Sequence, residues 1–123
     1  MMDDARMNED LPIIDAHHHL WQLSGGPLCY PWLQDAQPHE FFLGDYASLK
    51  RDYLPPDYRR DSAGHNVVKT VHVEAECRRD QQVAETQWLT DMNVRYGMPN
   101  ALWSQYLRPV DPKLVMPFAV VDT

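Results

Sequence analysis

Hydrophobic and polar residues alternate most clearly in two segments of the chain. The run NVVKTVHVEA, residues 66–75, is rich in β-branched residues. It alternates so that Val67, Lys69, Val71 and Val73 share one face and Val68, Thr70, His72 and Glu74 share the other. A shorter apolar run, residues 11–14, leads into IIDAHHHLWQ at residues 13–22. Alternation of this kind is typical of β-strands, so we predict one strand in each segment.

A helical pattern follows the second strand. Apolar residues recur about every four positions between Asp80 and Tyr96, which predicts a helix with Asp80 as its N-cap and Gly97 just past its end. Trp88 and Met92 lie on the apolar stripe, and we interpret both as core residues that pack against the sheet.

The remaining segments are less regular. Residues 1–10 form an acidic stretch without periodicity and are predicted to be a disordered tail. Residues 21–62 contain many proline and glycine breakers, so only short helices are expected, near 46–52 and 58–63. This long segment is rich in aromatic residues and either closes over a pocket as a lid or packs on the outside of the core. Beyond the long helix we expect a strand at 101–107 and a second apolar run at 114–121.

The order strand, short helix, strand, long helix, strand predicts an α/β fold with a parallel sheet and right-handed crossovers. Ligands of such sheets bind at the carboxyl ends of the strands. His17, His19 and Glu74 all fall at such ends. We therefore expect these three side chains to lie near one another.

The three consecutive histidines have three readings: metal ligands at a strand end, a polar cluster that only donates to backbone carbonyls, or part of a purification tag. Expression tags are longer and terminal, so the last reading is set aside. Side chains on a strand alternate, which places His17 and His19 on one face together with Asp15. Two converging imidazoles are suited to a divalent transition metal, and we predict His17 and His19 as metal ligands.

Four further residues are candidates for a substrate pocket: His72 and Glu74 at the end of the second strand, and Trp21 and Trp32 in the aromatic segment. Each of the first two also has a structural alternative. His72 is equally well explained as a hydrogen-bonded interior histidine, and Glu74 as the partner of an arginine at 78 or 79.

Composition narrows the classes of function. A formal net charge of −7 argues against nucleic acid and anionic membranes as partners. No apolar run is long enough to span a membrane and the acidic start lacks the features of a secretory signal, so we expect a cytoplasmic protein. Cys29 and Cys77 have no paired spacing and are interpreted as reduced thiols.

The segments IIDAHHHLWQ, YPWL at 30–33, RDYLPPDYRRD at 51–61 and NVVKTVHVEA together resemble the start of the amidohydrolase-related family, which includes sugar-lactone and pyrone-dicarboxylate lactonases. The similarity covers residues 11 to about 100, and its most specific part is Asp-x-His-x-His, here Asp15, His17 and His19. The family fold is a (β/α)₈ barrel. The resemblance implies an incomplete TIM barrel over 11–123, with two to three βα units and a long loop after the first strand.

The resemblance also implies a hydrolase that acts on a cyclic ester, such as a sugar lactone, or on an amide, with a divalent metal, zinc by expectation, at His17 and His19. A full barrel needs about 250 residues, and the family places its catalytic acid or base on later strands, so that residue is unknown here. The family pattern fades after about residue 100, which indicates truncation or a frame shift. The rival hypothesis is therefore a non-catalytic fragment, or part of an assembly in which another chain supplies the missing strands, with self-association through open barrel edges.

Overall fold

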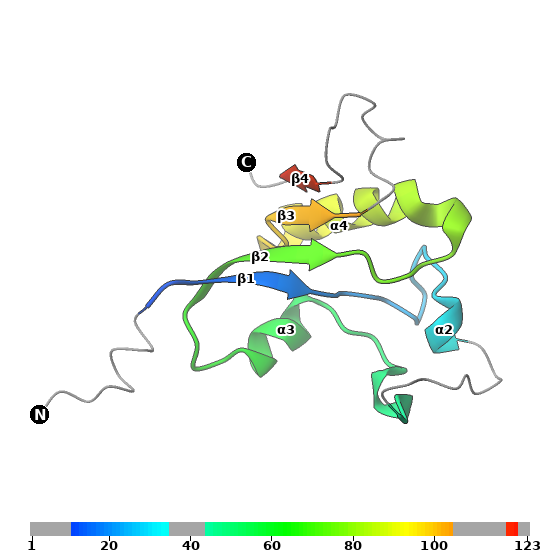
Figure 1. The fold of residues 1–123 in the computed structure, drawn as a ribbon, viewed down its shortest axis with the longest axis horizontal. Coiled ribbons are helices and arrows are strands. Elements are labelled where there is room, and N and C mark those ends of the chain that lie inside the picture. Colours follow the sequence, from blue (N-terminus) through cyan, green and yellow to red (C-terminus); the bar gives the residue numbers. More distant parts are fainter. Residues whose placement is uncertain (1–10, 35–43, 105–117, 121–123) are drawn as a thin grey trace, which may run out of the picture.

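The computed structural model describes residues 11–34, 44–104 and 118–120, and for the last range only the backbone. The disordered tail predicted for residues 1–10 lies outside these ranges, as do residues 105–107 and most of the apolar run at 114–121. Figure 1 shows the strands of the described part side by side, and the three parallel strands have their carboxyl ends toward the right of the view.

The described strands form one sheet in the order β1-β2-β3-β4. β1 (Ile13–His18), β2 (Val67–Val73) and β3 (Ala101–Trp103) are parallel, as the βαβαβ pattern predicts, and β4 (Phe118–Val120) pairs with β3 in the antiparallel direction. The parallel strands bring the ends of β1 and β2 to the same edge of the molecule.

The prediction of an incomplete (β/α)₈ TIM barrel is wrong for this structure. The described strands form an open sheet, and no barrel curvature or closure is present among them. The antiparallel β4 occupies the side of β3 where the next parallel strand of a barrel would pair. Because an edge accepts only one neighbouring strand, β4 ends the parallel succession after three strands.

α4 (Gln82–Tyr96) is the long helix and lies behind β2 and β3 in Figure 1. It ends as predicted at Gly97, whose φ of 75° lets its N–H bond the carbonyl of Asn93 at 2.8 Å. The predicted N-cap is wrong: a short 3₁₀ turn, η2 (Arg79–Gln81), precedes the helix, and Asp80 binds the guanidinium of Arg78 instead.

Three short helical pieces lie in the aromatic segment: α2 (Pro31–Gln34), η1 (Ala47–Leu49) and α3 (Pro55–Asp61). η1 falls inside the predicted piece at 46–52, whereas α3 begins three residues before the predicted 58. Proline is tolerated in the first turn of a helix, where its missing N–H has no partner to lose. The carboxylate of Asp57 accepts the N–H of Leu54 at 3.0 Å and fixes this start.

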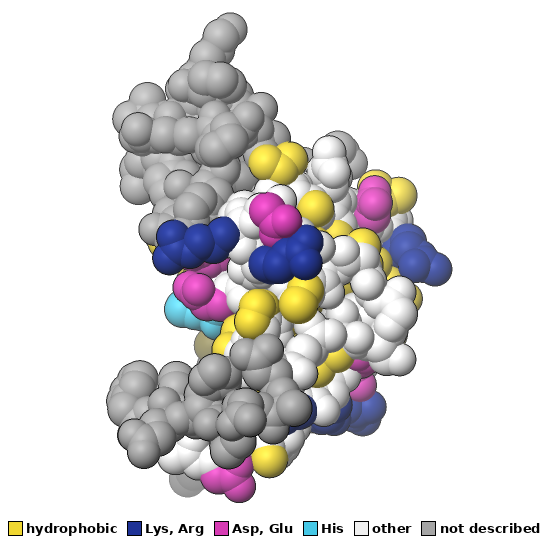
Figure 2. All heavy atoms as spheres, turned by 90° about the vertical axis from the view of Figure 1, so that its right-hand side faces the viewer, with side chains coloured by type: hydrophobic (Ala, Val, Ile, Leu, Met, Phe, Trp, Pro, Cys, Tyr) yellow, Lys and Arg dark blue, Asp and Glu magenta, His cyan; other side chains and the backbone are white. Residues whose placement is uncertain are grey.

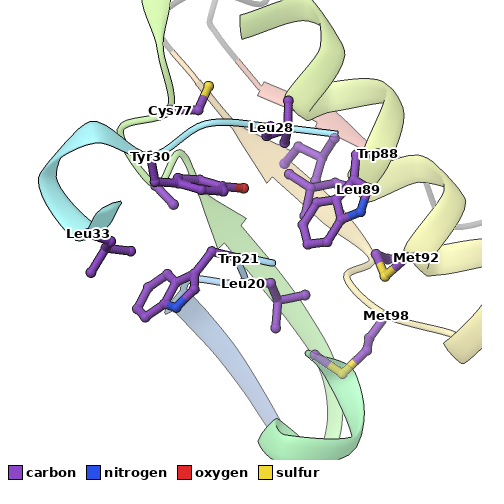
Figure 3. Packing of buried hydrophobic residues seen from close by; sticks show 12 residues of the cluster. Leu20, Trp21, Leu28, Tyr30, Leu33, Cys77, Trp88, Leu89, Met92 and Met98 are labelled. Atoms are coloured by element: carbon purple, nitrogen blue, oxygen red, sulfur yellow. The ribbon is translucent and has the colours of Figure 1, made fainter. Parts of the chain in front are cut away.

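The core lies between the sheet, α4 and the segment that follows β1. Figure 3 shows Trp88, Leu89 and Met92 of α4 pointing toward Leu20. Trp88 and Met92 are 7% and 5% exposed, which confirms their interpretation as core residues. The buried cluster consists of Leu20, Trp21, Leu28, Tyr30, Leu33, Ala75, Cys77, Trp88, Leu89, Met92, Met98 and Leu102.

Two further findings concern the cysteines and the helices. Cys29 and Cys77 are both free thiols. Within the described ranges, no helix combines the length and apolar character that crossing a membrane requires.

Candidate functional site

The first strand carries a β-bulge between Asp15 and His18. Asp15 pairs with Thr70 and His18 pairs with His72, so three steps along β1 match two steps along β2. Asp15 and His18 therefore face the same side of the sheet, where Tyr58 of α3 contacts both: its hydroxyl donates to Asp15 Oδ2 at 2.6 Å, and its ring centroid is 4.9 Å from that of His18. The expectation that Asp15 shares a face with His17 is wrong, because strict alternation fails at the bulge.

His17 and His19 converge as the sequence predicts. Their Nε2 atoms are 3.2 Å apart, and their rings meet edge to face with centroids 5.0 Å apart. His19 Nδ1 lies 2.8 Å from the carbonyl oxygen of Val73, and since a carbonyl only accepts, the proton of His19 sits on Nδ1. Burial lowers the pKa of His19 below its ordinary value. Nε2 of His19 therefore carries a lone pair, which accepts the Nε2 hydrogen of His17 in this structure and could instead bind a metal ion.

His18 and His72 are interior residues. His72 is 1% exposed and its Nε2 accepts the N–H of Leu20 at 2.9 Å, as its structural alternative predicts, and it is not among the described residues that line the hollow beside His19. The His18 ring lies 5.5 Å from the His72 ring, and burial lowers the pKa of His18 to about 4 and that of His72 well below its ordinary value. Both imidazoles are therefore neutral near pH 7. Both are buried near the carboxyl ends of β1 and β2.

A hollow of about 910 Å³ opens beside His19 at the carboxyl ends of β1 and β2. Its volume falls in the range of about 300–1,000 Å³ that is typical of small-molecule sites. Three predicted pocket residues, Trp21, Trp32 and Glu74, line it. Figure 2 faces this end of the molecule and shows cationic and acidic side chains close together near a histidine, with hydrophobic side chains beside them.

The aromatic segment supplies one wall of the hollow. The ring centroids of Trp21 and Trp32 are 5.8 Å apart, and those of Trp32 and Tyr46 are 5.9 Å apart. Trp21 Nε1 donates to the carbonyl of Arg51 at 2.7 Å and Trp32 Nε1 donates to the carbonyl of Ala75 at 2.9 Å. In its described part the segment therefore lines a pocket, in line with the first of the two readings of its sequence.

The loop after β2 forms another part of the lining. Glu74 accepts the hydroxyl of Ser104 at 2.8 Å through Oε2, and its N–H donates to the carbonyl of Trp103 at 3.0 Å. Arg78, which the sequence offers as a partner of Glu74, instead places Nε and Nη2 on the two carboxylate oxygens of Asp80, at 2.6 and 3.0 Å.

Glu85 of α4 is buried and accepts a hydrogen bond from the backbone of this loop. Its side chain is 1% exposed and its Oε2 accepts the N–H of Ala75 at 3.2 Å. Burial, together with the nearby Glu74 and Glu76, raises the pKa of Glu85 to about 7. Burial and the Glu85 carboxylate likewise raise the pKa of the Cys77 thiol, to about 12. The sequence pattern did not predict whether Glu85 is buried or exposed. Its burial is evident only from the packing of α4.

Three residues at this end were not singled out from sequence: Tyr58, Glu76 and Glu85. Tyr58 reaches Asp15 only because of the bulge, and Glu76 reaches the hollow from a left-handed backbone conformation with φ of 56°. Neither feature leaves a periodic signal in the sequence. The described residues contain no group of three or more histidine, cysteine or acidic side chains placed to hold a metal ion, so His17 and His19 stand there as a pair.

Comparison with known proteins gives one similar curated sequence and no fold neighbour. The chain is 36% identical over 93 residues to the uncharacterized protein y4mH of Sinorhizobium fredii (strain NBRC 101917 / NGR234). The alignment covers 76% of this chain and 30% of that protein, so the chain spans less than a third of the length of its relative. No protein-family model matches the chain, and no solved structure matches it significantly.

Proposed function

We propose that this chain carries the two-histidine part of a divalent metal site in a hydrolase of the amidohydrolase-related family, which opens a cyclic ester, such as a sugar lactone, or an amide. The observation that supports this most directly is the 3.2 Å separation of His17 Nε2 and His19 Nε2 beside a ligand-sized hollow. The resemblance of IIDAHHHLWQ and NVVKTVHVEA to that family supports the reaction class.

The pair of nitrogens fits a metal. Zinc–nitrogen bonds of about 2.0–2.1 Å at a tetrahedral angle place two ligand nitrogens about 3.3 Å apart. The observed separation agrees with that value. The bond between His19 Nδ1 and the Val73 carbonyl is the support that metal-binding histidines usually receive, because it fixes the tautomer and the ring orientation.

The protein would position the metal ion and shield a bound substrate from bulk water. His17 and His19 would hold the ion at the mouth of the hollow, and the wall formed by Trp21 and Trp32 would limit the access of bulk water to a bound substrate. A divalent ion at this place would polarise the substrate carbonyl or lower the pKa of a bound water. No residue of this chain is assigned as a further ligand or as the proton-accepting base. A cytoplasmic location belongs to the same proposal.

The experiment is a metal titration of the full chain. Cobalt(II) or zinc should bind with about one ion per chain, and His17→Ala and His19→Ala should each weaken binding by about tenfold to a hundredfold, as loss of a ligand or its support does. The matched control is His65→Ala, since His65 is exposed and precedes β2 at the opposite end of the sheet. Unchanged metal content in the double variant of His17 and His19 would contradict the ligand assignment.

A second candidate is a non-catalytic protein that associates through its first strand. β1 lies at the edge of the described sheet, and Leu11, Ile14 and Val68 near the start of β1 and β2 are 59%, 63% and 52% exposed. An open edge beside exposed apolar side chains favours pairing with another chain. Light scattering distinguishes the candidates: a monomer with lactonase turnover excludes the second, whereas an inactive oligomer that loses its partner on Ile14→Lys substitution supports it.

A further inference from the structure

The hollow beside His19 combines aromatic rings with carboxylates. We propose that it binds a ligand that carries a positively charged ammonium group, quaternary or primary. If the proposed hydrolase function holds, on which this statement about substrates rests, the substrate is an amine-bearing ester or amide. The binding itself needs neither metal nor turnover and is testable separately.

The aromatic wall is suited to a cation. Trp21, Trp32 and Tyr46 are in successive contact, with interplanar angles of 78° and 43°, so their rings do not lie in one plane. Both indole N–H groups are already bonded to backbone carbonyls. The surfaces of the indoles that remain for a ligand are therefore π faces and C–H edges, and a cation over such faces gains about 0.5–2 kcal/mol per site.

The charged side chains around the hollow also favour a positively charged ligand. Glu74 and Glu76 line it together with Arg78 and Arg79. Arg78 is bound by both carboxylate oxygens of Asp80, so its charge is locally compensated. Among the described residues of the lining, Glu74 and Glu76 therefore stand against Arg79, while Lys50 Nζ lies 5.4 Å from the centroid of the neighbouring Tyr46 ring.

Glu76 is held in a costly conformation at this place. Its φ of 56° lies in the left-handed region, which costs a side-chain-bearing residue about 1–2 kcal/mol. The backbone on both sides is anchored: Ala75 N–H to Glu85, the Ala75 carbonyl to Trp32, and Arg78 N–H to the carbonyl of Cys29 at 2.8 Å. Backbone strain that neighbouring hydrogen bonds maintain is typical of binding loops. Here the strained residue is an exposed glutamate that borders the hollow.

A neutral planar ligand is the main competing occupant. It would stack on the same rings but would gain nothing from Glu74 and Glu76. A pair of ligands that differ only in charge separates the two cases. Choline and 3,3-dimethylbutan-1-ol have nearly the same shape, and only choline is a cation.

The test is a fluorescence titration of the full chain with both compounds in the presence of a chelator, with the tryptophan emission as signal. Choline should bind saturably and at least about tenfold more tightly than the neutral alcohol, which corresponds to about 1.4 kcal/mol. Glu76→Gln, which keeps the shape of an exposed side chain, should weaken choline binding about threefold to tenfold. The control Asp91→Asn removes an exposed carboxylate of α4 that does not line the hollow, and should leave binding unchanged.

Equal affinity for choline and the alcohol, absence of choline binding, or equal effects of Glu76→Gln and Asp91→Asn would each overturn the inference. Circular dichroism of the Glu76 variant verifies that it is folded. Because the titration is done without metal, choline binding combined with failure of the metal experiment would refute the proposed hydrolase and leave the cation site standing. Metal binding as predicted, combined with failure of the choline titration, would refute only the cation site.

Discussion

Glu85→Gln is predicted to change the pH dependence of stability. Glu85 is 1% exposed, and its pKa is about 7 in the folded protein against an ordinary value of 4.5. Between these values the folded chain binds more protons than the unfolded chain, so the contribution of Glu85 to folding is complete below about pH 4.5 and is lost as pH rises to about 7. At about 1.4 kcal/mol per pH unit, the loss is about 3 kcal/mol.

Glutamine keeps an oxygen that accepts the N–H of Ala75 but has no proton to lose. The free energy of unfolding of the variant minus that of the wild type should therefore rise by about 3 kcal/mol from pH 4.5 to 7.5 and then stay constant. Urea denaturation at closely spaced pH values measures this difference. Groups that titrate identically in both proteins, including the histidines, cancel in the subtraction.

Asp91→Asn is the matched control on the same helix, because its carboxylate is exposed. A pH dependence for Glu85→Gln that does not exceed the one measured for this control would refute the reasoning, since it would mean that the Glu85 carboxyl titrates equally in the folded and unfolded states.

Two further substitutions test the fold around the site by urea denaturation. Tyr58→Phe removes the 2.6 Å hydrogen bond to Asp15 and should lower the free energy of unfolding by about 1.5–3 kcal/mol at pH 7, as is typical of bonds to charged groups; a change below 0.5 kcal/mol would show that water replaces the hydroxyl without cost. Gly97→Ala should cost about 1 kcal/mol through its φ of 75° alone, because the added Cβ would meet only Arg59 Nη2, at an ordinary 3.8 Å; a loss of several kcal/mol would point to a clash instead.

Local periodicity was sufficient for the main elements. The valine alternation of β2 and the four-residue spacing of α4 describe which side chains one backbone geometry places together, so both elements lie close to their predicted ranges. Gly97 marks the helix end for the same local reason. The convergence of His17 and His19 is also local, since it depends on two residues of one extended segment.

The outcome for Asp15, His72 and Glu85 depended on contacts between segments far apart in the sequence. The bulge that turns Asp15 toward Tyr58 is a property of the register between β1 and β2. Burial of His72 requires Leu20 to lie above it, and burial of Glu85 requires the loop after β2. None of these pairings is encoded by a period in either segment.

The sequence by itself determined the first two strands, the long helix and the convergence of two imidazoles, because each follows from backbone geometry over a few residues. The tertiary structure decided that the sheet is open, with β4 antiparallel beside β3, and that aromatic rings and carboxylates border one hollow. The physical reason is that strand order, register and the filling of space depend on the whole set of packed neighbours.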